Sequence, residues 1–211
     1  MDGPFVLIEP QEFRRFLDGV EPIPAPVAPA ASQSRRLAVV FAPLVTREET
    51  NLLFIRRADR GDPWSGQIAF PGGHEETTDA DPLATGYREL TEEVGIRREE
   101  VTYLGDLGYF QTQTTKVIVR AFVGLWDGRE PAQANSAEVA GICEVPLSHL
   151  LAHHRREGFD ASTAEQLGRR LIYPLTPAAL AALAKPDATI WGVTARIVHH
   201  LLGIIAKISV G

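Results

Sequence analysis

Three glutamates of one predicted helix have the spacing needed to hold a divalent cation. Residues 81–95 read DPLATGYRELTEEVG, in which Glu89, Glu92 and Glu93 are spaced i, i+3 and i+4. At about 100° per residue these carboxylates fall on one face of a helix, and Mg²⁺ prefers such oxygen ligands. An isolated acidic face is more often simply solvated, so the surrounding residues must decide between a metal site and an ordinary surface.

This helix carries its own start and stop signals. Asp81 is a predicted N-cap, and Pro82 takes the first helical position, where a missing N–H costs nothing. Gly95 is a predicted left-handed stop. A separate apolar stripe would pack the helix against a sheet, and it consists of Leu83, Tyr87, Leu90 and Val94.

The neighbouring residues favour the metal site. RELTEEVGI at 88–96 resembles the second half of the Nudix box, R-E-U-x-E-E-x-G-U with U aliphatic, and Gly73 resembles the opening glycine of that box. Asp79 stands at the acidic position of the box, and the loop from Asp79 to Arg88 is one residue longer than in the common form. The chain therefore resembles a Nudix hydrolase.

The longer loop is similar to that of the Nudix branch that contains coenzyme A diphosphatases. FPGG at 70–73 and DAD at 79–81 are typical of the same branch, and the likeness extends over about residues 36–205. One departure is Asp62, because the branch usually has an arginine four residues before the glycine that matches Gly66. The departure weakens the coenzyme A assignment and leaves the hydrolase assignment unchanged.

The resemblance implies a metal site on the predicted helix. Glu89 and Glu93 would be the main ligands of Mg²⁺, with Glu92 close behind. The carbonyl of Gly72 would be a backbone ligand, and Mn²⁺ is an alternative cation. Arg88 would orient a glutamate through a salt bridge.

A hydrolase also needs a general base that takes a proton from the attacking water. Nudix branches use the box or a glutamate of a later loop, which makes Glu92, Glu138 and Glu144 the candidates here. We favour Glu92 or Glu138, and the sequence does not separate them. The role of Asp79 is open between local pairing, capping of the loop and a contact outside the ligand shell.

An anionic substrate would need a local basic patch, because the formal net charge is −6. The candidates for this patch are Arg56, Arg57, Arg60 and Lys116. Arg56 and Arg57 alternate along a predicted strand, so only one of them can face the cleft. Phe70 could stack on an adenine or pack in the core, and Gln111 begins a polar loop, 111–115, that could shape access.

The favoured reaction is hydrolysis of coenzyme A or acyl-coenzyme A to 4′-phosphopantetheine and adenosine 3′,5′-bisphosphate. Within the same enzyme class, ADP-ribose, dinucleotides and nucleotide sugars are alternative substrates. A rival of another class is a non-catalytic Nudix module that senses nucleotides. Such modules typically lose carboxylates of the box, and all three are present here.

The composition further narrows the classes of protein to which the chain can belong. The hydrophobic content of 45% and the charged content of 23% are ordinary for a globular protein. The acidic balance argues against a broad nucleic-acid surface, and no run of eighteen apolar residues predicts a membrane span. Cys143 is the only cysteine and is expected to be a buried, inert thiol. With no basic region at the start, a cytoplasmic protein is expected.

The predicted elements are a mixed β-sheet between helices, and the resemblance implies the same α/β/α sandwich. We divide the chain into an N-terminal arm at 1–34, which has a proline-rich linker outside the core, and a Nudix hydrolase domain at 35–211. Predicted strands lie at 37–45, 52–58, 67–70, 101–110, 115–126, 137–145 and 170–175. Besides the carboxylate helix, predicted helices lie at 10–20, 146–151, 177–184 and 189–206.

Three further expectations concern other segments. Residues 72–73 should form a tight glycine turn, and 153–168 should be irregular. The last helix is apolar on most of its circumference, so either core burial or a homodimer interface would cover it. The paired histidines are expected to be structural, and they are His153, His154, His199 and His200.

Overall fold

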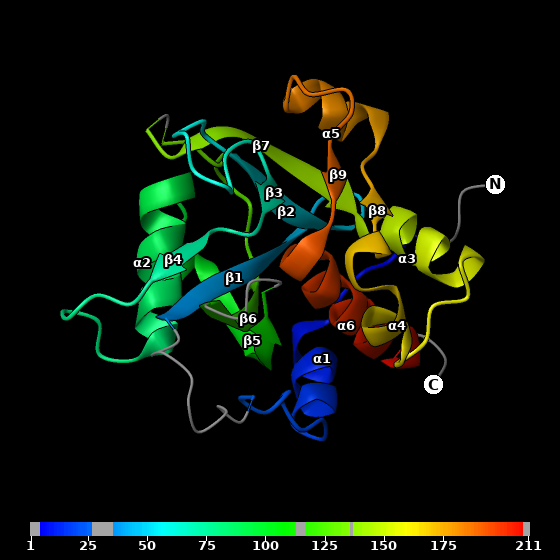
Figure 1. Cartoon of the computed structure of the whole chain (residues 1–211). Coiled ribbons are helices and arrows are strands. Elements are labelled where there is room, and N and C mark those ends of the chain that lie inside the picture. Colours follow the sequence, from blue (N-terminus) through cyan, green and yellow to red (C-terminus); the bar gives the residue numbers. More distant parts are fainter. Residues whose placement is uncertain (1–4, 27–35, 113–116, 136, 209–211) are drawn as a thin grey trace, which may run out of the picture.

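A mixed β-sheet forms the centre of the protein (Figure 1). The computed structural model describes residues 5–26, 36–112, 117–135 and 137–208. Within these residues the sheet has seven strands in the order β3-β2-β1-β6-β5, with β4 added to β1 and β7 added to β2. The pair β1 and β6 is parallel and the other pairs of this sheet are antiparallel, so the expected mixed sheet is confirmed.

The strands are β1 (Arg36–Thr46), β2 (Thr50–Arg57), β3 (Ile68–Ala69), β4 (Gly72–His74), β5 (Val101–Gln111), β6 (Val117–Trp126), β7 (Val139–Pro146), and a separate pair, β8 (Tyr173–Pro174) and β9 (Thr189–Ile190). The helices are α1 (Pro10–Leu17), α2 (Pro82–Val94), α3 (Leu147–Arg156), α4 (Thr163–Leu167), α5 (Pro177–Ala182) and α6 (Gly192–Ile208), with short 3-10 turns at Arg98–Glu100 and Gly168–Arg170.

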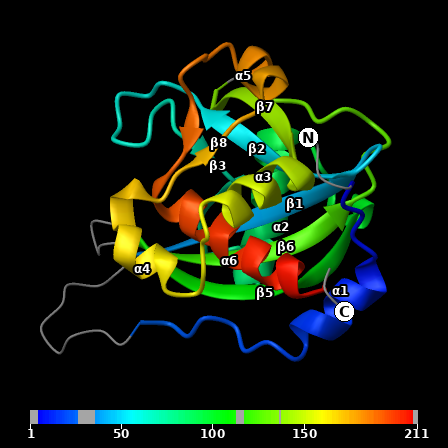
Figure 2. The same cartoon turned by 90° about the vertical axis from the view of Figure 1, so that its right-hand side faces the viewer.

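Helices cover both faces of the sheet, which makes the fold an α/β/α sandwich as expected (Figures 1 and 2). Helix α2 lies on one face, while α1, α3 and α6 lie on the other. Successive side chains of a strand point to opposite faces. In β2, accordingly, Leu52 and Phe54 enter the core beneath α6, whereas Leu53 and Ile55 enter the core beneath α2.

The predicted limits of α2 are confirmed at both ends. The Asp81 carboxylate accepts a hydrogen bond from the Ala84 N–H at 2.8 Å, and Pro82 opens the helix. Gly95 adopts the left-handed conformation with φ of 72°, a conformation that costs glycine little. The start of α2 therefore follows from local chemistry, and that start sets which side chains face the sheet.

The described part of the N-terminal arm packs on the domain. Phe13 and Leu17 of α1 are buried in the core cluster that also contains residues of β5 and α6. The Ile8 N–H donates to Thr50 Oγ1 at 3.0 Å, and Ile23 forms a parallel bridge with Gly108. These side chains thus lie within the core rather than outside it. The division at 34/35 falls in residues 27–35, outside the described residues.

Several predicted segments differ from the structure. Residues 72–73 are not a turn but part of strand β4, which pairs with β1. The segment 153–168 is not irregular, because α3 continues to Arg156 and α4 follows. Leu150, Leu151 and His154 are buried along one face of α3, so its polar residues mark the solvent face of a helix rather than a loop.

Helix α6 begins at Gly192 rather than Thr189, since 189–190 pair with β8. Nine of its residues are buried, and α1, α3 and β5 pack against it.

His154 and His199 lie in this core as well, where the Tyr173 hydroxyl hydrogen-bonds with both rings. Burial lowers the pKa of His154 to about 4, as is typical of a neutral core histidine. Among the described helices, none has the length and apolar character to cross a bilayer.

Replacing Phe13 with alanine tests whether the arm belongs to the core. The side chain is 1% exposed, so Phe13→Ala should lower the free energy of unfolding by about 3 kcal/mol, measured by urea denaturation. Phe5 is 72% exposed, and Phe5→Ala is the matched control, with an expected change within about 0.5 kcal/mol. Equal stability of the two variants would contradict the packing of α1 in the core.

Candidate active site

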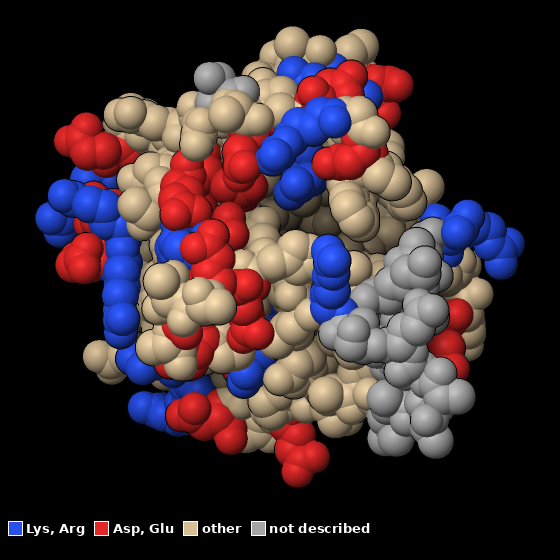
Figure 3. All heavy atoms as spheres, turned by 60° about the vertical axis from the view of Figure 1, so that its left-hand side comes forward, with Lys and Arg blue, Asp and Glu red and all other residues tan. Residues whose placement is uncertain are grey.

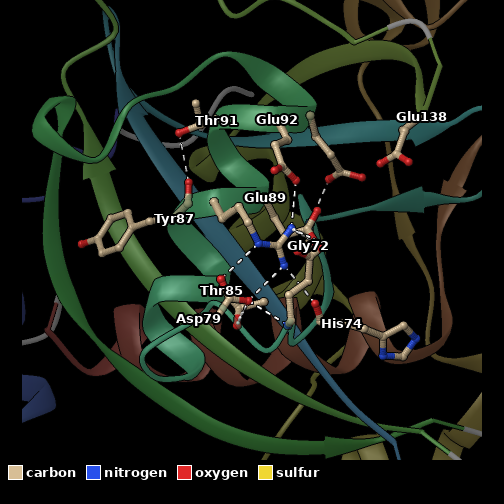
Figure 4. A network of polar contacts seen from close by, with 12 residues as sticks. Gly72, His74, Asp79, Thr85, Tyr87, Glu89, Thr91, Glu92 and Glu138 are labelled. Atoms are coloured by element: carbon tan, nitrogen blue, oxygen red, sulfur yellow. Dashed lines mark hydrogen bonds and ion pairs between the residues drawn. The ribbon is translucent and has the colours of Figure 1, made fainter.

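Three carboxylates from two segments converge beside the glycine-rich strand β4. Glu89 and Glu93 project from α2, and Glu138 comes from the segment just before β7. One oxygen of each lies within 4.8 Å of an oxygen of the other two. Figure 4 shows Glu138 pointing toward the acidic side chains of the helix. Acidic oxygens at this spacing are suited to a hard divalent cation.

Strand β4 allows this convergence because it has no side chains at two positions. The backbone N–H of Gly72 donates to Glu93 Oε2 at 2.9 Å. A Cβ added at Gly73 would overlap the Glu89 carboxylate. The two glycines therefore let the backbone approach both acids closely, which is their role here in place of a turn.

Backbone hydrogen bonds hold the segment of Glu138 in place. The Asn135 N–H donates to the carbonyl of Glu93 at 3.0 Å, which ties this segment to the end of α2. The Ala58 N–H donates to the carbonyl of Glu138 at 2.8 Å. The Glu138 side chain forms an ion pair with Arg60 at 2.9 Å. Glu138 is thus positioned by contacts to the helix and to the end of β2.

Arg88 connects the acids to the loop before the helix. Its Nη1 donates to Glu89 Oε1 at 2.9 Å and to Glu92 Oε2 at 2.8 Å, while Nη2 donates to the carbonyl of His74 at 2.9 Å. Nε and Nη2 both reach Asp79, at 3.1 Å each (Figure 4). A planar guanidinium can satisfy these directions together, whereas an ammonium cannot.

Asp79 is both a loop cap and a partner of Arg88. Its Oδ2 accepts hydrogen bonds from the Glu76 N–H and the Thr85 hydroxyl, each at 2.9 Å. Hydrogen bonds from Arg88 are the largest cause that lowers the pKa of Asp79 to about 2. The aspartate is thus ionised and holds the arginine, which in turn holds Glu89.

The buried acids are electrostatically unfavourable without a cation. Burial raises the pKa of Glu93 to about 7, partly offset by the Gly72 N–H, and the neighbouring Glu89 raises it further. Burial also raises the pKa of Glu89 against the opposing effect of Arg88. A divalent cation would favour the ionised form of both, so the donor set fits such an ion.

A pocket of about 470 Å³ opens beside the glycines. Gly72, Gly73, Arg57 and Arg60 line one part of it, and apolar residues of β1, β6 and α6 line another. In the space-filling view, acidic side chains gather along one side of a hollow that basic side chains also border (Figure 3). An anionic group with a neutral extension matches this distribution of charge.

Arg56 and Arg57 of β2 have different surroundings in the structure. Arg57 lines the pocket and its Nη1 lies 4.0 Å from Glu93 Oε1. Arg56 points elsewhere and donates to the carbonyl of Ala140 at 3.3 Å. Of the two arginines, Arg57 is therefore the one that lines the pocket.

Phe70 and Gln111, which were also predicted to contact the substrate, are less favourably placed than Arg57 to do so. Phe70 borders the pocket, but its side chain is buried and its ring stacks on Phe54 at 4.8 Å, so it packs in the core. Gln111 lies at a different pocket, where its carbonyl accepts a hydrogen bond from Arg196. Lys116 and the rest of 113–116 are outside the described residues.

Two glutamates lie apart from the three converging acids. The Glu92 side chain is 52% exposed and pairs with Arg88, and it is not one of the three acids that converge. Glu144 pairs with Arg47 at 2.7 Å, far along β7 from Glu138.

Among the described residues, Trp64 is a pocket residue that was not predicted from the sequence. An apolar residue in a turn rich in glycine, proline and charge was the available signal.

An α/β/α sandwich with clustered acids beside a basic pocket defines a class of hydrolases that act on phosphate anhydrides. The model of the NUDIX domain matches residues 35–167. Curated relatives named uncharacterized Nudix hydrolase NudL, from Yersinia pestis strain Pestoides F and Yersinia pseudotuberculosis serotype O:1b, are each 34% identical over 170 residues, covering 81% of this chain and 80% of the relative.

Solved structures are similar at lower identity. The NUDIX domain of Shewanella oneidensis NrtR in complex with ADP ribose has a TM-score of 0.47 and 18% identity, covering 75% of this chain and 90% of that one. A C. elegans Ap4A hydrolase has a TM-score of 0.46 and 13% identity, covering 61% of this chain and 90% of that one. The chain belongs to the Nudix family. It is a Nudix hydrolase, an enzyme of pyrophosphate bonds in a family that uses divalent metals.

Replacing Gly73 with alanine tests the contact between β4 and α2. We expect Mg²⁺ to raise the melting temperature of the unmodified protein, and we expect Gly73→Ala to lose most of that rise, because the added methyl group would displace the Glu89 carboxylate. Gly203→Ala is the control, because nothing lies within 4 Å of its Cβ position on helix α6. A full Mg²⁺-dependent rise in Gly73→Ala would contradict this account.

Proposed function

We propose that this protein hydrolyses the diphosphate bond of coenzyme A and its acyl forms with Mg²⁺, giving 4′-phosphopantetheine and adenosine 3′,5′-bisphosphate. The observation that carries the proposal is the convergence of Glu89, Glu93 and Glu138 beside the glycines and arginines that line a pocket. The FPGG motif at 70–73 and the long loop before α2 support this substrate over others of the class.

In this proposal each residue has a separate task. Glu89 and Glu93 hold the cation, which supplies charge neutralisation at the phosphates and acidifies water when it is bound. Arg88 holds Glu89 in position from the side away from the pocket. Arg57 lies where it can donate to a phosphate oxygen, which a guanidinium does bidentately.

We assign Glu138 as the general base that takes a proton from the attacking water. It shares the cluster with Glu89 and Glu93, and its side chain remains 39% exposed, so water can reach it. Glu92 is paired with Arg88 and is not one of the three acids whose oxygens converge. Attack of water on one phosphorus breaks the P–O–P bond, and each product keeps one of the two phosphoryl groups of the former diphosphate.

The departure at position 62 is compatible with this substrate. Asp62 accepts hydrogen bonds from the Trp64 N–H and the Ser65 hydroxyl, so it shapes a turn. Arg60, two residues earlier, lines the pocket and brings a guanidinium to the same loop. Arg60 thus places a guanidinium on the loop that lacks an arginine at position 62, and this guanidinium also pairs with Glu138.

Incubation with a panel of diphosphates tests the substrate. With Mg²⁺ we expect coenzyme A to be split faster than ADP-ribose, dinucleotides or nucleotide sugars, because the pocket offers apolar walls for a long neutral arm. Chromatography of the products is the measurement, EDTA should stop the reaction, and Mn²⁺ serves as a second cation. Intact coenzyme A beside cleaved ADP-ribose would exclude the proposed substrate. If every compound stays intact, the domain is a non-catalytic nucleotide sensor.

Three glutamine variants test the tasks of the acids. Glu93→Gln should lower kcat about 100-fold or more and weaken Mg²⁺ binding, since a buried charged ligand is lost. Glu138→Gln should lower kcat by about 10²–10⁴-fold with Mg²⁺ binding largely kept. Glu92→Gln is the matched control and should lose less than about tenfold, because its ion pair is exposed. The reverse order of Glu92→Gln and Glu138→Gln would make Glu92 the base.

A further inference from the structure

The turn between β2 and β3 holds an exposed tryptophan at the mouth of the pocket. Trp64 is 46% exposed, and it lines the pocket together with Arg57 and Arg60. A single exposed aromatic side chain is common on protein surfaces, and what distinguishes Trp64 is that it lines this pocket. Packing within the described part of the chain therefore leaves much of the indole open to whatever enters the pocket.

The turn is ordered by its own hydrogen bonds before anything binds. Asp62 Oδ1 accepts from the Trp64 N–H at 2.8 Å, and the Ser65 hydroxyl oxygen accepts from the N–H groups of Arg60 and Asp62 at 3.0 and 3.1 Å. The Gln67 side-chain amide donates to the carbonyl of Pro63 at 2.6 Å. The backbone that presents Trp64 is thus held in place, so binding against it requires little ordering of this turn.

The surroundings of Trp64 combine three kinds of chemistry. Two guanidiniums, those of Arg57 and Arg60, line the same pocket, and Gly72 and Gly73 connect it to the acidic cluster. The opposite wall is apolar and includes Val193 and Ile197 of α6 together with strand residues Val117 and Val119. A ligand that satisfies all of them has a flat ring, negative charge close to that ring, and an uncharged remainder.

We propose that Trp64 is the specificity-determining residue that stacks on the base of the nucleoside half of the substrate. This inference rests on the proposed function only as far as the substrate is a nucleotide diphosphate. An indole face gains most from a flat π-system, and stacking of a base on an aromatic side chain is worth about one to two powers of ten in affinity. Pantetheine has no ring, so the apolar wall of α6 and β6 suits that half better.

Measuring the two halves of coenzyme A one at a time shows which end of the pocket binds each half. Calorimetry with adenosine 3′,5′-bisphosphate and with 4′-phosphopantetheine measures each affinity without turnover. We expect Trp64→Ala to bind the adenosine bisphosphate about tenfold or more weakly and to bind phosphopantetheine unchanged. Trp64→Phe keeps an aromatic face and should retain most of the affinity.

Trp191→Ala is the matched control, because Trp191 is 39% exposed and does not line this pocket. It should bind both halves as the unmodified protein does. Unchanged affinity of Trp64→Ala for the adenosine bisphosphate would overturn the proposal, and so would a loss confined to phosphopantetheine, since the base would then lie elsewhere.

The same variants distinguish a failure of this inference from a failure of the proposed function. If coenzyme A is not cleaved but AMP and ADP-ribose bind about tenfold more weakly to Trp64→Ala, the stacking role stands and the substrate assignment falls. If coenzyme A is cleaved and Trp64→Ala has the same KM and the same affinity for the adenosine half, the substrate stands and the stacking role falls.

Discussion

Two buried carboxylates that face each other are the constraint on which the site depends. Glu89 and Glu93 are 7% and 1% exposed, and ionising both in such surroundings is costly unless each gains a partner. Arg88 pairs with Glu89, Arg60 pairs with Glu138, and the Gly72 N–H donates to Glu93, yet burial still raises the pKa of Glu93 to about 7. The protein therefore keeps part of its acid cluster uncompensated, which is the usual condition of a site that awaits a cation.

The elements around the cluster are explained by this constraint. Helix α2 has a fixed start at Asp81, so Glu89 and Glu93 face β4 rather than solvent. Strand β4 carries glycines where side chains would collide with the acids. The loop before the helix closes on Arg88 through Asp79, whose low pKa keeps that pair charged over the physiological range. Together, the start of α2, the glycines of β4 and the pair of Asp79 with Arg88 hold the acids at distances that an ion can bridge.

Local chemistry explains which parts could be predicted from the sequence. The cap, the apolar stripe and the stop of α2 depend on neighbours in the chain, so α2 was predicted with its correct limits. The place of Glu138 depends on a contact 45 residues away from Glu93, which spacing cannot reveal. Glu92 shares a helix face with the other acids, but it lies toward solvent, where its i,i+4 pair with Arg88 is favourable. The C-terminal end of α3 and all of α4 were missed because a helix with a narrow buried face resembles a loop.

Position 62 shows why residue identity and residue role must be read together. As a motif position, Asp62 removes a positive charge from the branch signature and so counts against a phosphate-rich substrate. In the folded turn, the same carboxylate fixes the backbone that presents Trp64, while Arg60 lines the same pocket. An arginine at position 62 could not accept these hydrogen bonds, because a guanidinium has only donors. The Asp62 carboxylate therefore stabilises the turn that presents Trp64, and Arg60 of the same loop brings a guanidinium to the pocket.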